Sequence, residues 1–208
     1  MPIYATKPEQ TEFAKVEPGT YMARCFSMIE IGHIDTEYNG KKKHDHKVML
    51  TWELPEELAV FKEGNPPEPY VVSKTYTLSM YEKSTLRKDL ESWRGQGFTE
   101  IEAAKFDILK LIGVPCLLTI THKPGHADPS KMYVEVSSIA KLMKGQECPQ
   151  QINPTKVLSY DNFDWTIFEG LSDNMKDKIR KSDEFKALQE PAMVHDEQEN
   201  GVADDLPF

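Results

Sequence analysis

The 208-residue chain lacks the sequence features of membrane-spanning, secreted or disulfide-stabilised proteins. No apolar run is long enough to cross a bilayer, and residues 1–4 do not begin the basic-then-apolar pattern of a signal peptide. The three cysteines, Cys25, Cys116 and Cys148, are far apart and odd in number, which favours reduced, mostly buried thiols over a disulfide framework. We therefore expect a cytoplasmic protein without membrane contacts.

The chain also lacks the short motifs of common enzymes. There is no phosphate-cradling glycine loop, no nucleophile elbow and no cluster of carboxylates ahead of a base. Residues 44–46 form a compact His-Asp-His triplet, and His122 and His126 are four apart. However, no C-x-x-C pair accompanies them and no predicted helix aligns the histidines. The sequence therefore predicts no enzyme activity, no cofactor and no metal site.

Lysine and arginine are absent from the last nineteen residues, 190–208. This segment contains six carboxylates, and without them the remaining 28 acidic residues stand against 25 Lys and Arg, so the formal charge changes from −9 to −3. Such a segment cannot bury enough apolar surface to fold, so residues 189–208 are predicted to be a disordered acidic tail. Solubility alone does not require apolar residues at the exposed end. We therefore expect the tip to bind a basic, apolar-floored pocket on another protein through Asp204, Asp205, Leu206, Pro207 and Phe208.

Strand and helix patterns follow one another between residues 19 and 145. Strands are predicted at 20–31, 47–54, 70–80, 115–123 and 132–139, and helical segments capped by Ser84 and Thr99 lie between the third and fourth strands. This order matches a five-stranded Greek-key OB-fold barrel with a helical insertion between strands 3 and 4. The sequence thus predicts a mainly β fold of this type, with a generic α+β domain as the alternative.

Basic residues concentrate in the two loops with which an OB-fold binds oligonucleotides, those joining strands 1 to 2 and 4 to 5. The first predicted loop, 32–46, contains three consecutive lysines and the turn signal Asn39-Gly40, whereas the loop after the second strand is acidic. Sequence-tolerant binding of single strands combines such cations with aromatic faces for bases. The predicted single-stranded DNA contacts are Tyr38, Lys41, Lys42, Lys43, Lys47, Trp52, Lys74, Tyr76, Tyr81, His122, Lys123, Lys131 and Tyr133.

Each aromatic residue in this set could instead be part of the core. Trp52 alternates with Leu50 and Leu54, so an inward position is as well supported as an outward one. Trp93 shares a helical apolar stripe with Leu86 and Leu90, and we interpret it as structural.

Several segments together resemble a group of small bacteriophage single-stranded DNA-binding proteins. The resemblance rests on residues 50–55 (LTWELP), 73–79 (SKTYTLS) and 83–95 (KSTLRKDLESWRG). The last residues are similar to the acidic tip of bacterial and phage proteins of this kind, with Leu206 where isoleucine is common. The resemblance implies an OB-fold that coats single-stranded DNA without sequence preference, in the host-cell cytoplasm, during replication or recombination. It also implies that the tip recruits a polymerase, helicase, primase or nuclease.

The expected organisation has four parts. A leader (1–18) precedes the OB-fold domain (19–145), an extension (146–188) follows, and the acidic tail (189–208) ends the sequence. The extension, with a helix at 172–188, is expected either to pack on the barrel or to mediate self-association. Two alternative functions remain open from sequence: a DNA-mimicking adaptor or inhibitor that binds a replication enzyme but no DNA, and a metal-dependent nuclease.

Overall fold

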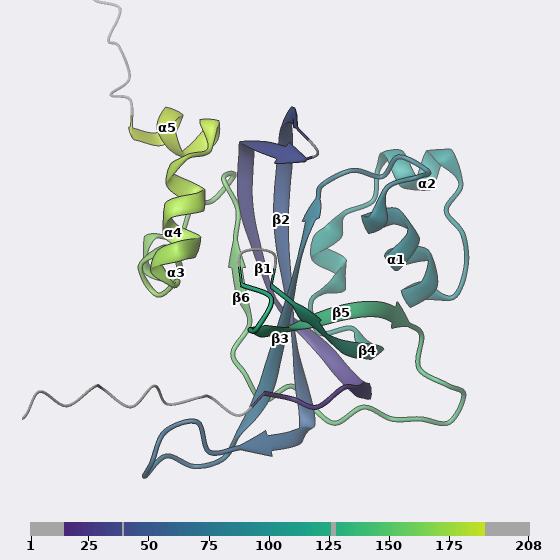
Figure 1. The fold of residues 1–208 in the computed structure, drawn as a ribbon. Helices are drawn as coiled ribbons and strands as arrows, with labels where there is room; N and C mark the ends of the chain where they lie inside the picture. The colour runs from purple at the N-terminus through teal and green to yellow at the C-terminus, as the bar shows by residue number, and fades with distance from the viewer. Residues whose placement is uncertain (1–14, 39, 126–127, 190–208) are drawn as a thin grey trace, which may run out of the picture.

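The computed structural model describes residues 15–38, 40–125 and 128–189. The structure is mainly β, with a sheet at its centre. Two groups of helices lie on opposite sides of the longest hairpin of this sheet, the one formed by residues 19–59 (Figure 1). Within these residues, no helix is both long enough and apolar enough to span a membrane.

The sheet contains six strands. They are β1 (Gly19–Tyr38), β2 (Lys41–Ala59), β3 (Glu68–Thr77), β4 (Pro115–Pro124), β5 (Met132–Ala140) and β6 (Lys156–Leu158). The order is β3-β2-β1-β4-β5 with antiparallel neighbours, and β6 adds a short parallel pairing to β1 at Ser27–Ile29. The end of the sheet formed by β5 lies in contact with β3. The predicted mainly β class and the helical segment between the third and fourth strands are confirmed.

The first two strands extend well beyond their predicted ends. Residues 32–46 were expected to form a long connection, but β1 continues to Tyr38 and β2 begins at Lys41. Tyr38 pairs with Lys41, so the connection is tight and includes Gly40, whose φ of +71° suits glycine. The predicted loop was wrong because backbone pairing across β1 and β2 continues where the side chains become polar.

The main core is built from alternate residues of β2 and from the helix that follows β3. Leu50, Trp52 and Leu54 face inward and are at most 1% exposed, as their spacing in the sequence allowed. Helix α1 (Thr85–Arg94) begins at the N-cap Ser84, and Trp93 packs against Trp52 with ring centroids 5.8 Å apart. The structural interpretation of Trp93 is confirmed. Two shorter segments complete this part of the chain: α2 (Glu100–Ala104), with the predicted Thr99 capping box, and the 3-10 helix η1 (Ile108–Leu111).

A second apolar cluster joins the C-terminal helices to β1. Helices α3 (Trp165–Glu169), α4 (Asp173–Arg180) and α5 (Asp183–Gln189) pack through Phe168, Ile179 and Phe185 on Ile29 and Ile31. The single helix expected at 172–188 is therefore two helices. They are separated at residues 181–182, and the buried Ser182 hydroxyl accepts a hydrogen bond from the Phe185 N–H (3.2 Å).

The segment between β5 and β6 is held to the sheet by two charged side chains. Glu53 is fully buried and accepts hydrogen bonds from the Ile152 N–H (2.6 Å) and from the Asn153 N–H and side-chain amide (both 2.7 Å). Arg24 donates to the carbonyls of Cys148 and Pro149. These contacts fix the segment after β5 to the sheet.

The cysteines are free thiols. Cys25 and Cys116 are fully buried, and burial raises the pKa of Cys25 to about 12. Cys148 is partly buried. A thiol with so high a pKa is a poor nucleophile at neutral pH. The expected reduced, mostly buried thiols are observed.

A candidate nucleic-acid interface

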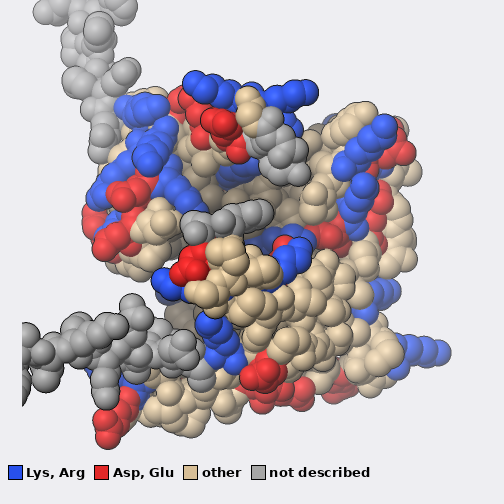
Figure 2. Space-filling model, in the orientation of Figure 1, with Lys and Arg blue, Asp and Glu red and all other residues tan. Residues whose placement is uncertain are grey.

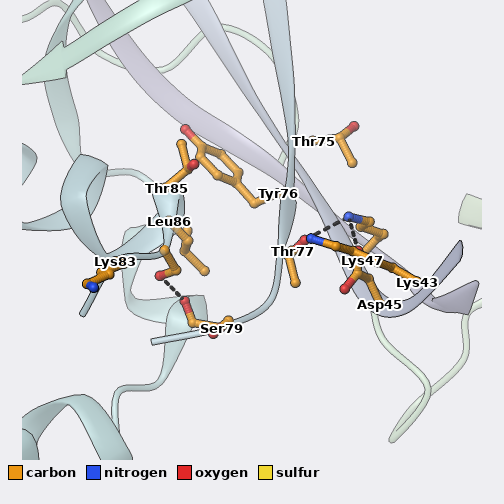
Figure 3. Close-up of a pocket in the computed structure, with 11 residues that line it drawn as sticks. Lys43, Asp45, Lys47, Thr75, Tyr76, Thr77, Ser79, Lys83, Thr85 and Leu86 are labelled. Carbon is orange, nitrogen blue, oxygen red and sulfur yellow. Dashed lines mark hydrogen bonds and ion pairs between the residues drawn. The ribbon is translucent and has the colours of Figure 1, made fainter. Parts of the chain in front are cut away.

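A polar pocket of about 410 Å³ lies between β2, β3 and the N-terminal end of α1 (Figure 3). Three lysines and one aspartate supply the charges of its lining, and most other contributors carry hydroxyl groups. The lining residues are Lys43, Asp45, Lys47, Thr75, Tyr76, Thr77, Ser79, Lys83, Ser84, Thr85 and Leu86. The pocket is therefore positively charged and rich in hydrogen-bonding groups.

Lys47 is held in place at the pocket by two neighbouring strands. Its Nζ donates to Asp45 Oδ2 (2.9 Å) and to Thr77 Oγ1 on β3 (2.7 Å), and its side chain is 17% exposed. The hydrogen bond from Lys47 holds the pKa of the Asp45 carboxyl below its usual value, so this carboxyl is ionised at neutral pH. Asp45 also accepts from Thr36 Oγ1 (3.3 Å). Lys47 is thus a pre-positioned cation rather than a mobile one.

The other lysines near this pocket are exposed. Lys43 and Lys83 reach it from the β1–β2 hairpin and from the start of α1, and Lys41 and Lys42 extend the basic series toward the hairpin turn. Among the described residues, none of these four amines lies within 4 Å of a carboxylate. Figure 2 shows that the face in view is hollowed near its middle, with Lys and Arg as well as Asp and Glu side chains along the edge of the hollow. These amines are available to an anionic ligand.

The β2–β3 ribbon has opposite charges at its two ends. Lys47 pairs with Thr77 at the end nearest the pocket, whereas Ala59 pairs with Glu68 at the other end. The exposed Glu56 and Glu57 lie near that second end. The sequence predicted a basic segment between the first two strands and an acidic segment after the second strand, and this contrast in charge is present in the structure. The basic residues, however, lie on β2 and not in a loop.

Two of the predicted base-stacking residues are core residues, and these predictions are corrected. Trp52 is 0% exposed and packs against Trp93, so neither face of its indole is open to a base. Tyr76 is 3% exposed and donates its hydroxyl to Asp89 Oδ2 (2.9 Å). Burial and the Asp89 charge raise the pKa of Tyr76. Lys74 also binds Asp89 (2.8 Å), so it neutralises this carboxylate in the fold.

The β4–β5 hairpin carries the remaining predicted contacts. Tyr133 is 56% exposed and its ring lies against Gly125, where a Cβ atom would come within 2.5 Å of the ring. Lys131 is exposed, Lys123 forms an ion pair with Glu135, and His122 Nε2 lies 2.8 Å from the Val16 carbonyl. Tyr133 and Lys131 are thus the accessible members of this group.

Of the other predictions, Tyr81 is 66% exposed in the segment between β3 and α1, and its carbonyl accepts from the Ser84 N–H (2.8 Å). Tyr38 ends β1, paired in register with Lys41. The predicted tip, residues 204–208, and His126 lie outside the described residues. The structure thus brings the predicted residues Lys43 and Lys47 together at one pocket. Lys83 also lines this pocket but was not predicted, because it lies just before α1 and outside the two loops expected to bind DNA.

A second polar cluster lies where α5 meets the β1–β2 hairpin. His33 Nδ1 is 2.5 Å from Glu184 Oε1, and His46 Nε2 is 2.8 Å from Glu30 Oε1. The neighbouring His44 contacts Asp35 and Asp183. Sequence reasoning considered His44 and His46 but missed this arrangement, because its members are up to 151 residues apart.

Comparison with protein-family models, curated proteins and solved structures gave no match. Function is therefore inferred from the chain's own residues. The groups around the pocket are amines and hydroxyls, and its single carboxylate is engaged by Lys47. Such a surface is suited to holding phosphate groups, which favour fixed cations and hydrogen-bond donors.

Proposed function

We propose that this chain binds single-stranded DNA without sequence preference, across the face formed by β2, β3 and the turn ends of the β1–β2 and β4–β5 hairpins. The observation that carries the proposal is the convergence of Lys43, Lys47 and Lys83 on one polar pocket of this face. Lysines along a groove neutralise backbone phosphates, and binding of this kind does not depend on base identity.

The strand order supports assignment of the sheet to an OB-fold. In that fold five strands follow a Greek-key path, a helix often lies between the third and fourth, and the first strand pairs with both the second and the fourth. Here β1 pairs with β2 and β4, α1 and α2 follow β3, and β5 contacts β3. We propose that this β3–β5 contact closes the barrel. Oligonucleotides bind OB-folds across strands 2 and 3, which is where the pocket lies.

Exposed aromatic rings supply the second component of single-strand binding. Tyr81 and Tyr133 are each more than half exposed, and both belong to segments beside the strands of this face. Base stacking on such rings contributes about 1–3 kcal/mol per base and tolerates any base. The proposed path therefore combines lysines for phosphates with two tyrosines for bases.

The resemblance to phage single-stranded DNA-binding proteins gives the proposed biological role. The chain would coat and protect single strands during replication or recombination, and residues 204–208 would recruit a replication enzyme. Two aspartates next to Leu206, Pro207 and Phe208 suit a basic pocket with an apolar floor. We propose no catalytic activity for the chain.

Fluorescence anisotropy of a labelled oligo-dT, compared with a duplex of equal length across a salt series, tests the proposal. We expect tight single-strand binding that weakens with salt. Replacing Lys43, Lys47 and Lys83 together by alanine should weaken it further and reduce the salt slope by about 0.7 for each phosphate that is no longer neutralised.

The matched control replaces three exposed lysines outside the pocket, Lys105, Lys110 and Lys144, which changes net charge by the same amount. Equal decreases in affinity in the two triple variants would contradict a localised interface. An intact chain that does not bind oligo-dT would rule out the proposal and favour the DNA-mimicking adaptor.

A further inference from the structure

The polar cluster between α5 and the β1–β2 hairpin is formed by side chains from three elements. His33 belongs to β1, His46 to β2 and Glu184 to α5, and we call these three residues the histidine cluster. One ring nitrogen of each histidine and one carboxylate oxygen of Glu184 all lie within 4.8 Å of one another. The rings of His33 and His46 are 4.4 Å apart and tilted by 33°. Two imidazoles and a carboxylate therefore converge on one point.

A fourth oxygen adjoins the cluster. Glu30 Oε1 is 2.8 Å from His46 Nε2, while its other oxygen, Oε2, accepts the Tyr160 N–H (2.9 Å). Glu184 is oriented similarly, because its Oε2 accepts the His33 N–H (2.7 Å) while Oε1 faces the His33 ring. Each carboxylate thus has one oxygen fixed by a backbone donor and the other directed at an imidazole. Such outer hydrogen bonds orient the ligands of protein metal sites.

The backbone of β1 permits this close approach through a glycine. Gly32 has φ +90°, and a Cβ atom at this position would lie 2.5 Å from Glu184 Oε2 and 2.8 Å from the Ser182 side chain. Any other residue here would therefore force the Glu184 carboxylate and the Ser182 side chain to shift. The Ser182 hydroxyl, 2.7 Å from the Tyr160 hydroxyl, further fixes the start of α5. The carboxylate of Glu184 is thus held at the histidines by several independent contacts.

We propose that His33, His46 and Glu184, with Glu30 as a fourth ligand, bind a divalent transition-metal ion of the zinc class. Two imidazole nitrogens and carboxylate oxygens suit Zn²⁺, whereas Ca²⁺ and Mg²⁺ favour all-oxygen sites. The side chains are between 22% and 43% exposed, so an ion can enter from solvent. On binding, the proton that bridges each imidazole and its carboxylate moves to the other ring nitrogen or to solvent. The ion would cross-link α5 to the β1–β2 hairpin.

The test uses the full chain, stripped of metal with EDTA and exchanged into chelator-free buffer. Titration with Zn²⁺ against a chromophoric chelator should show one high-affinity ion per chain. His46→Gln and Glu184→Gln should each lower the affinity for Zn²⁺ by at least about tenfold. Even the loss of a residue that only hydrogen-bonds to a metal ligand typically lowers metal affinity by about 10- to 100-fold. His122→Gln is the matched control, since it removes an imidazole from β4 outside the cluster, and it should bind like the parent.

Thermal unfolding gives a second readout and shows whether each variant is folded. A ligand that binds only the native state raises Tm, so Zn²⁺ should raise it in the parent and in His122→Gln but not in the two cluster variants, and Mg²⁺ should not reproduce the effect. If either cluster variant does not fold, Glu30→Gln takes its place, with loss of affinity expected. Absence of saturable Zn²⁺ binding, or parent-like affinity in the cluster variants, would overturn the proposal and leave these residues as histidine–carboxylate ion pairs.

Discussion

Trp52 and Tyr133 are both aromatic residues on strands, yet the indole of Trp52 is fully buried whereas Tyr133 is 56% exposed. The Trp52 indole N–H has no hydrogen-bond partner among the described residues. A buried unsatisfied donor costs about 1–3 kcal/mol, which the large apolar surface of the ring offsets. Packing, rather than ligand binding, therefore accounts for Trp52.

This difference leads to a prediction about single substitutions. Tyr133→Ala should lower the affinity for oligo-dT by about 5- to 150-fold, the equivalent of 1–3 kcal/mol of stacking. Trp52→Phe should leave that affinity unchanged, because the residue has no exposed face. Anisotropy titrations of both variants, with thermal unfolding to confirm that they are folded, provide the measurement. A folded Trp52→Phe variant with weakened DNA binding would contradict this assignment.

The spacing of Leu50, Trp52 and Leu54 was enough to place these residues on one face of a strand. It was not enough to choose between the inner and outer faces, because a two-residue period is the same for both. Tyr76 posed the same problem. Its burial depends on Asp89 of α1, which accepts its hydroxyl from a different element. Sequence spacing thus located these side chains on strands, and tertiary contacts determined their roles.

At the scale of elements, the order of β1 to β5 with the helices after β3 was predictable, whereas β6, α3 and the ends of the first hairpin were not. The main core strands have apolar alternation, and α1 has a clear cap at each end, Ser84 and Gly95. Residues 41–46 are all polar, so no periodic apolar signal marks them as strand. They are strand because each pairs with the backbone of β1. The histidine cluster was equally hidden, since α5 brings Glu184 to a hairpin more than a hundred residues earlier.

We expect the docking of α5 to depend on Gly32, and this dependence can be measured. Gly32→Ala should lower the free energy of unfolding by about 1–3 kcal/mol more than Gly64→Ala does, because both have positive φ but only Gly32 faces another element. At Gly64, with φ +85°, an added Cβ atom would meet nothing within 4 Å, so this position isolates the backbone contribution. Denaturant unfolding gives the stabilities, and hydrogen exchange of residues 183–189 reports the docking. Equal decreases in stability in the two variants would show that α5 does not depend on this contact.

At the scale of the whole molecule, charge is unevenly distributed along the chain. The net charge of −9 includes six carboxylates in residues 190–208, whereas the pocket has three lysines and one aspartate. A tethered segment competes with a ligand at an effective concentration in the millimolar range. We therefore expect the acidic segment to oppose binding of DNA at the lysines.

Removal of residues 190–208 should consequently increase the affinity for oligo-dT at low salt. The increase should disappear at high salt, since screening shortens the Debye length to about 3 Å at 1 M. Anisotropy titrations of the intact chain and of a chain ending at Gln189, at matched salt, measure the difference. Unchanged affinity at low salt would exclude competition by this segment.

The central position of β1 has a consequence for how the chain folds. Its residues pair with β2, β4 and β6, and its side chains contact Pro149 and Glu184. β1 thus acquires its last side-chain contact only after residue 184 has been synthesised. Until β4 has been synthesised, residues 19–23 have no strand partner among the described residues, and the long-range contacts of β1 favour slow folding. The nascent chain would therefore pass through a stage in which an unpaired strand edge is open to chaperones.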